Sequence, residues 1–252
     1  MRSFLEQGLC TLVALALWEA IGRSGLVAAG VLPPFSAVAP VMLELAGSAE
    51  FLREAQVTLV EVLAAFGIAA PLGLACGALL GESRRWGAIF NPVIELVLAV
   101  PQSVFLPLFM LALGTGYAQK IVFGVTHAFF IITVNTVAAV RSVPRSWVAL
   151  ARVSGARRGQ IYRRIYLPAM LPLVLAGLRL GLIFDVTGVL LAEMFASRHG
   201  VGRLIFGWGE NDQIPQLIAG ILLVAAVTVI LNGLLRLWEA RAGAWRSAGR
   251  PA

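Results

Sequence analysis

Ionisable residues inside long apolar runs are the side chains of this sequence best placed to do chemistry. Glu61, Asp185 and Glu193 are the clearest examples, and Thr187 lies two residues beyond Asp185. Charged groups at membrane depth are costly, so they usually face a cavity or a partner. Asp185 and Thr187 are therefore expected to line a polar pathway or a dimer interface, with an internal ion pair or interhelical hydrogen bond as the alternative. Glu193 is a further candidate for the pathway, whereas Glu61, near the end of its run, fits a gate or an interfacial position equally well.

Residue patterns typical of enzymes are missing from the sequence. A phosphate-binding P-loop needs a lysine directly after a glycine, but the only lysine, Lys120, follows a glutamine. His127 and His199 belong to no metalloprotease or hydrolase motif. Cys10 and Cys76 both lie in apolar runs, where a thiol usually acts as a small hydrophobic group. We therefore predict no catalytic residue, no metal site and no cofactor in this chain, and no ATP hydrolysis of its own.

The elements that must position these residues are membrane-spanning helices. The 252 residues are 59% hydrophobic and 13% charged, whereas soluble domains have about 25% charged residues, and the mean hydropathy is +0.87. Because a span needs roughly 20 apolar residues, we predict a single-domain, all-α integral membrane protein with about six transmembrane helices. The expected helices are Leu9–Ala29, Phe51–Leu80, Ile89–Leu113, Lys120–Val140, Ala169–Phe195 and Gln213–Leu235.

Several local features refine this plan. An irregular or short-helical connection is expected at Leu32–Ser48, which is rich in proline. Two prolines, Pro101 and Pro107, are expected to bend the third helix. Small residues allow close helix contact, and the second helix offers three such positions: Gly67, Gly73 and Gly77.

The positive charges orient the chain. Fourteen arginines fall on one side of the predicted spans, at positions 2, 84, 85, 141, 145, 152, 157, 158, 163, 164, 236, 241, 246 and 250. Five basic residues fall on the other side, at positions 23, 53, 120, 198 and 203. By the positive-inside rule, both termini are predicted to be cytoplasmic. The segment 236–252 is then a basic cytoplasmic tail.

A basic stretch, Ala149–Pro168, lies between two of the spans. Pro144 fits the first turn of a helix, with Ser142 as its cap. Four residues share one face of that helix: Trp147, Leu150, Ala151 and Ser154. Gly155 is expected to end it, and a second short helix is expected at Ala156–Ile165 before Pro168 opens the next run. The sequence therefore predicts a helix, a bend and a helix outside the bilayer; an ordinary basic loop that anchors two spans is the alternative.

This stretch carries a family resemblance. Gly155, nine residues, Ile165, one residue, Leu167 and Pro168 reproduce the second half of the pattern E-A-A-x3-G-x9-I-x-L-P. That pattern resembles the EAA loop of bacterial ABC importer permeases, although Ala149, Leu150 and Ala151 stand in place of Glu-Ala-Ala. The resemblance covers about Leu32 to Gly202 and is closest to the nitrate, sulfonate, taurine and bicarbonate group. Other parts that carry it are Val100–Gly116, Ala192–Glu193 and Gly200–Gly202, whereas Glu61 stands where the family often has arginine.

The resemblance implies a type I ABC importer permease fold in the bacterial inner membrane. The segments would be an N-terminal helix with its outer connection (1–50), core helices (51–235) and a cytoplasmic coupling loop (141–168). The residues it implies for coupling to the ATPase are Ala149, Leu150, Ala151, Gly155, Ile165, Leu167 and Pro168. Two permease copies, a homodimer, would form the pathway, with cytoplasmic ATPase subunits that bind ATP and Mg and a periplasmic or lipoprotein solute-binding protein.

Two other classes compete with this interpretation. A proton-coupled secondary transporter would use Asp185 and Glu193 as a relay, but the sequence has no internal repeat of the kind common in such folds. A membrane assembly subunit without transport would also be apolar and basic, yet it gives no reason for the spacing from Gly155 to Pro168. The solute, whether a sulfonate, nitrate, taurine, bicarbonate or vitamin precursor, is not fixed by the sequence.

Overall fold

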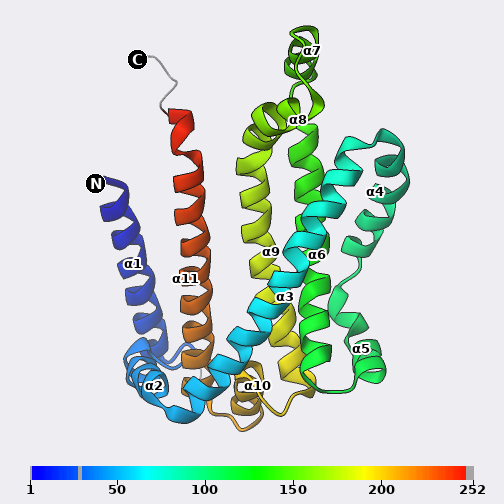
Figure 1. The fold of residues 1–252 in the computed structure, drawn as a ribbon. Coiled ribbons are helices and arrows are strands. Elements are labelled where there is room, and N and C mark those ends of the chain that lie inside the picture. The colour runs from blue at the N-terminus through cyan, green and yellow to red at the C-terminus, as the bar shows by residue number, and fades with distance from the viewer. Residues whose placement is uncertain (1, 28–29, 248–252) are drawn as a thin grey trace. The chain divides into compact units, whose positions relative to one another are not determined.

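The structure is a computed structural model that describes residues 2–27 and 30–247. Every regular element within those residues is helical, as predicted. The α-helices are α1 (Arg2–Ser24), α2 (Phe35–Gly47), α3 (Ala49–Glu82), α4 (Arg84–Ala99), α5 (Leu106–Leu113), α6 (Tyr117–Arg141), α7 (Arg145–Val153), α8 (Arg158–Ile161), α9 (Leu167–Ala196), α10 (Val201–Glu210) and α11 (Ile214–Ser247). A 3-10 turn (Gln102–Phe105) precedes α5, and a π-helical turn (Tyr162–Tyr166) precedes α9 (Figure 1).

Most of the predicted spans are present as long apolar helices. Among the described residues, 4 segments are long and apolar enough to cross a membrane: Ala49–Glu82, Tyr117–Arg141, Arg158–Phe195 and Ile214–Leu237. The pair formed by α4 and the segment Gln102–Leu113 would be a fifth, bent by 84°. The first predicted span, Leu9–Ala29, is not among these segments. The 23-residue α1 covers its first part and ends at Ser24, and Ala29 lies outside the described residues. The basic tail begins inside α11, and its last arginine, Arg250, lies outside the described residues.

The bend between α4 and α5 has one proline behind it, not two. The expected bend at Pro101 is confirmed, because this residue directly follows the end of α4 and precedes the 3-10 turn. Pro107 lies in the first turn of α5, where the missing N–H has no helical partner to lose. The prediction that Pro107 also bends the span was therefore wrong.

The chain divides into two compact units. One comprises residues 1–58 and 193–227, and the other residues 59–192 and 228–252. In the first unit, the predicted connection after α1 folds as the short helix α2. The indole N–H of Trp18 donates to the carbonyl of Pro33 at 3.0 Å, and the Trp18 and Phe35 rings meet edge to face at 5.4 Å. The backbone N–H of Ser36 donates to Glu19 at 2.9 Å, which fixes the start of α2 against α1.

In the second unit, α3 packs closely against α6 along a row of glycines. A Cβ on Gly73 would lie 2.9 Å from Ile132, and one on Gly77 would lie 2.5 Å from the Cβ of Thr136. Contacts this short exist only because the glycines carry no side chain. Gly67 also permits close contact, but it has open space where its Cβ would be, so no helix of the described chain packs against it. The seam between α3 and α6 therefore depends on the second and third of the three predicted positions.

Candidate coupling loop and buried polar residues

The loop between α6 and α9 folds as the predicted helix and bend. Pro144 directly precedes α7, and Gly155 follows its end with φ of +79°. The N–H of Gly155 donates to Arg152 at 3.0 Å and that of Ala156 donates to Ala151 at 2.9 Å. This pair of bonds is the Schellman arrangement, which places a residue in the left-handed region at that position. Glycine is thus required there by its backbone conformation, since no atom lies within 4 Å of its missing Cβ.

The predicted cap of this helix has a different role. Ser142 lies at the end of α6, and its hydroxyl donates to the carbonyl of Ala139 at 2.8 Å instead of accepting from α7. The prediction that Ser142 caps the following helix was therefore wrong. The first turn of α7 begins instead with a bond from the N–H of Trp147 to the carbonyl of Pro144 at 3.1 Å.

The second predicted helix of the loop continues into the next span. α8, the π-helical turn and α9 follow one another without a break, so that Arg158–Phe195 forms one 38-residue segment. Pro168 lies in the first turn of α9, two residues after the end of the π turn. Our prediction of a separate helix ending at Ile165 therefore missed this continuity.

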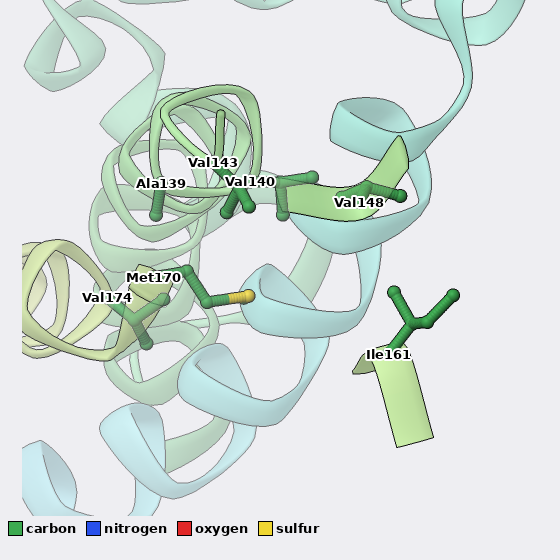
Figure 2. Close-up of a cluster of buried hydrophobic side chains, with 7 residues drawn as sticks. All are labelled: Ala139, Val140, Val143, Val148, Ile161, Met170 and Val174. Carbon is green, nitrogen blue, oxygen red and sulfur yellow. The ribbon is translucent and has the colours of Figure 1, made fainter. Parts of the chain in front are cut away.

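One side of the loop is held to the ends of α6 and α9 by a buried apolar cluster. Its members are Ala139, Val140, Val143, Val148, Ile161, Met170 and Val174. They come from α6, α7, α8, α9 and the turn between α6 and α7, and Figure 2 labels their side chains. Val148 supplies the contact from α7, and Met170 and Val174 supply those from α9. Because interiors of this kind pack densely, the loop is fixed to both helices and does not hang from its two ends.

The other side of the loop is exposed and apolar. The side chains of Leu150 and Trp147 are 69% and 54% exposed. Together with the rest of the predicted helical face they line a groove of about 540 Å³, whose residues are Trp147, Leu150, Ala151, Ser154, Arg164, Ile165, Pro168 and Ala169. Arg164 is the one charged residue of this lining. An exposed apolar groove at the tip of a helical loop is typical of a surface that binds another protein.

The seven residues predicted for coupling divide into three groups. Four of them line the groove: Leu150, Ala151, Ile165 and Pro168. Ala149 and Leu167 are exposed outside it, and Gly155 shapes the bend. The structure adds Arg164 and Ala169, which sequence reasoning missed. The sequence positions of these two residues could have indicated them. Arg164 directly precedes Ile165 and Ala169 directly follows Pro168, in the segment that the glycine bend brings next to α7.

Two of the candidate acidic residues are fully buried in the second unit. Glu61 of α3 forms an ion pair with Lys120 of α6, and the Lys120 ammonium also lies 4.9 Å from the centre of the Tyr117 ring. Asp185 of α9 lies against Gly124 of α6, with its Oδ1 at 2.7 Å from the place of the missing Cβ. Neither carboxyl oxygen of Asp185 has a hydrogen-bond partner within the described part of the chain. The sequence did not indicate that Glu61 would form a buried ion pair with Lys120.

Thr187 is placed differently from its neighbour. Its side chain is exposed on α9, and its hydroxyl donates to the carbonyl of Ile183 at 2.9 Å. Apolar residues at helical spacing share this exposed side, among them Ile183 and Phe184. Asp185 and Thr187 are two residues apart, and this spacing places them on opposite sides of α9. The two side chains therefore cannot face one surface together.

Glu193 belongs to a buried network in the first unit that holds the start of α10. Its carboxylate accepts hydrogen bonds from the hydroxyl of Thr58 and from the N–H of Gly202, both at 2.7 Å. Thr58 in turn accepts from the N–H of Val201 at 2.9 Å. The N-terminus of a helix exposes unpaired N–H groups and a positive dipole end, so carboxylates stabilise it.

A second carboxylate of this network is Glu54. It accepts from the N–H of Gly200 at 2.6 Å and contacts the ring of His199 at 3.4 Å. Gly200 has φ of +112°, and a Cβ there would overlap the carboxylate of Glu193. Glu54 and Thr58 were not among the predicted sites. Their only sequence signal is their spacing of four, which places them on one face of α3.

Comparison with known proteins decides the family. The family model of the binding-protein-dependent transport system inner membrane component matches residues 69–243. The chain belongs to this family. The putative aliphatic sulfonates transport permease protein of Bacillus subtilis (strain 168) is 32% identical over 236 residues, which cover 94% of this chain and 86% of the relative. The taurine transport system permease protein of Escherichia coli (strain K12) is 29% identical over 238 residues, covering 92% and 86%.

Solved structures agree on the fold of this permease. A chain of the MetNI methionine ABC transporter, solved in an inward-facing conformation, superposes with a TM-score of 0.60 at 21% identity, covering 77% of this chain and 94% of that one. The predicted type I importer fold and the resemblance to the sulfonate, taurine and nitrate group are both confirmed. The protein is therefore a permease subunit of an ABC importer and an inner-membrane component.

Proposed function

We propose that this permease couples to a cytoplasmic ATPase through the groove beside α7, and that the coupling drives import of a small polar or anionic solute. The observation that carries the proposal is the exposed apolar face of α7 over a groove at the tip of a loop whose other side is packed onto α6 and α9. An apolar surface kept exposed on one side of a firmly anchored helix is suited to receive a partner. Movement of that partner would then be passed to both helices.

The partners follow from the family. We infer two permease copies in a homodimer, two ATPase subunits that supply the ATP site, and a solute-binding protein outside the membrane. This chain has no lysine directly after a glycine, so it lacks the residue that a P-loop needs. The excess of arginines on the side of the α7 loop supports an orientation with this loop and both termini in the cytoplasm.

The solute is proposed from the relatives alone. Permeases for aliphatic sulfonates, for taurine and for nitrate are among those that resemble this chain. The shared property of these solutes is a compact, strongly acidic oxyanion group. We infer that the importer takes a solute of this kind and that the binding protein selects it.

The four candidate pathway or gate residues receive uneven support. Thr187 is exposed on α9, and we propose that it faces the pathway or the second permease copy. Glu61, Asp185 and Glu193 are fully buried in this chain, so any part they play in a gate would require helices to separate. Separation of the helices around Glu61 would be especially unfavourable, because it would break the buried ion pair of Glu61 and Lys120.

The test compares two single variants, each of which introduces a carboxylate at one of two adjacent positions of α7. Leu150→Asp puts a charge into the groove, whereas Ala149→Glu puts one on exposed surface where the family often has glutamate. Both positions are exposed, so neither change should affect folding. We expect Leu150→Asp to lower solute uptake and co-purification of the ATPase by at least about tenfold, equivalent to about 1.4 kcal/mol of docking energy. Ala149→Glu should leave both unchanged or improve them.

Gly155→Val supplies an independent check. A β-branched residue at φ of +79° is strained by about 1–2 kcal/mol or more, so the bend and the groove should be disturbed. Uptake that remains normal in Leu150→Asp, with the ATPase still bound, would contradict the groove as the docking site. Uptake driven by a proton gradient in the absence of any ATPase would contradict the coupled mechanism itself.

A further inference from the structure

A polar pocket of about 690 Å³ lies at the end of the second unit that carries the α7 loop. It is formed where α3 ends, α4 begins, α6 ends and α7 begins. Three arginines line it: Arg84, Arg141 and Arg145. None of them forms an ion pair or a side-chain hydrogen bond with another described residue. Three guanidinium groups around one hollow, none of them in an ion pair, form a site for a negatively charged group.

Arg141 is directed into this pocket by the backbone of α4. Its Nη2 atom lies against Gly87, over the position that a Cβ would occupy. Gly87 is buried and lines the pocket, so the absence of a side chain makes room for the guanidinium. Arg84 approaches from the first turn of α4 and Arg145 from the first turn of α7. The three charges thus come from three separate segments and meet only in the fold.

The carboxylates in the same pocket limit the charge of the ligand. Glu82 and Glu95 also line it, so the formal charge of the lining is three minus two, or +1. A phosphodiester carries a single negative charge and matches this value. A phosphodiester therefore neutralises the lining, whereas a free phosphate monoester or a nucleotide would leave negative charge in excess next to the two glutamates.

A second hollow next to this pocket is apolar. It has a volume of about 490 Å³ and is lined by Cys76, Leu79, Leu80, Glu82, Ser83 and Trp86. Glu82 lines both hollows, so they are neighbours. The side chains of Leu79 and Trp86 are 68% and 55% exposed. Tryptophan is enriched at the level of lipid headgroups, which places this pair of hollows at a membrane surface.

We propose that the two hollows together bind one phospholipid of the leaflet on the α7 side. Its phosphodiester would lie among Arg84, Arg141 and Arg145, and the start of an acyl chain would lie along Leu79 and Trp86. Basic pockets between transmembrane helices bind lipid headgroups in this way. The apolar hollow favours an amphiphile over a free oxyanion, because a soluble anion would leave it unused. A lipid there would brace the ends of α3, α4 and α6 next to the α7 loop.

The test uses the importer complex purified in mild detergent, with phosphatidylglycerol as the probe and bound lipid counted by native mass spectrometry. Arg84→Gln removes a pocket arginine, and Arg85→Gln, its neighbour outside the pocket lining, is the matched control. A contribution of about 1 kcal/mol per arginine near a headgroup corresponds to roughly fivefold weaker binding for Arg84→Gln. The double variant Arg84→Gln/Arg141→Gln should weaken binding about 25-fold. Arg85→Gln should not change it.

A second arm distinguishes a lipid from a free anion. Leu79→Ser changes the apolar hollow without changing any charge, so it should weaken phosphatidylglycerol binding and leave methanesulfonate binding unaffected. The proposal is overturned if Arg84→Gln and Arg85→Gln retain lipid equally. It is also overturned if Arg84→Gln weakens methanesulfonate binding alone, or if it releases the ATPase while the lipid stays bound. If the double variant does not assemble, the single variants decide the question.

Discussion

Replacing Glu193 by glutamine tests whether the start of α10 is held by charge. The carboxylate accepts two hydrogen bonds, from Thr58 and from Gly202, each at 2.7 Å. Glutamine has the same shape, but its amide can accept one of these bonds with its oxygen and must turn an N–H₂ group toward the other donor. A hydrogen bond to a charged group contributes about 1.5–3 kcal/mol, so we expect a loss of about 2–3 kcal/mol.

The loss should be visible as lower thermal stability. At about 2–4 °C per kcal/mol for a chain of this size, the apparent melting temperature of the purified permease should fall by roughly 5–10 °C. Glu50→Gln is the matched control, because Glu50 is exposed in the first turn of α3 and should have no such effect. An unchanged melting temperature in Glu193→Gln would refute the clamp. Normal melting together with a loss of uptake would assign Glu193 to the pathway instead.

Two further predictions concern the second unit. Gly77→Ala should lower the melting temperature by several degrees, because its Cβ would lie 2.5 Å from that of Thr136 and overpacking costs about 1–3 kcal/mol. Gly67→Ala on the same helix has open space and should leave the melting temperature unchanged or raise it; equal effects of the two changes would contradict the packing argument. Asp185→Asn should change the melting temperature and uptake little, because it removes a carboxylate that has no hydrogen-bond partner in the described chain. A loss of uptake with normal melting would show that Asp185 acts in transport.

The structure of the α7 loop was largely predictable because its determinants are local. A glycine that must adopt a positive φ, a proline at the start of a helix and an apolar face at helical spacing are all readable over a few residues. The groove face of α7 was therefore predicted correctly. The continuation of the second helix through Pro168 was not, because helices usually end at or before the residue that precedes a proline, whereas here a π turn leads directly into α9.

The buried polar contacts were not predictable in the same way. Glu54 and Gly200 are 146 residues apart in sequence, and Thr58 and Glu193 are 135 apart. No periodicity relates such positions, since they meet only when the chain has folded. The sequence did show that Glu61 and Glu193 were unusual residues for apolar runs. It did not show that one would pair with Lys120 and the other would bind a helix N-terminus.

The packing around α7 determines what a pull on the loop can do. The cluster that anchors it takes Val140 from α6 and Met170 and Val174 from α9. A force applied at Leu150 therefore reaches both helices through one densely packed group, and dense interiors transmit displacement instead of absorbing it. Farther along α6, close contacts at the glycines of α3 and the ion pair of Lys120 and Glu61 fix α6 to α3. Because both kinds of contact resist separation, α3, α6 and α9 should move together as a rigid body if, as proposed above, a docked ATPase moves the loop.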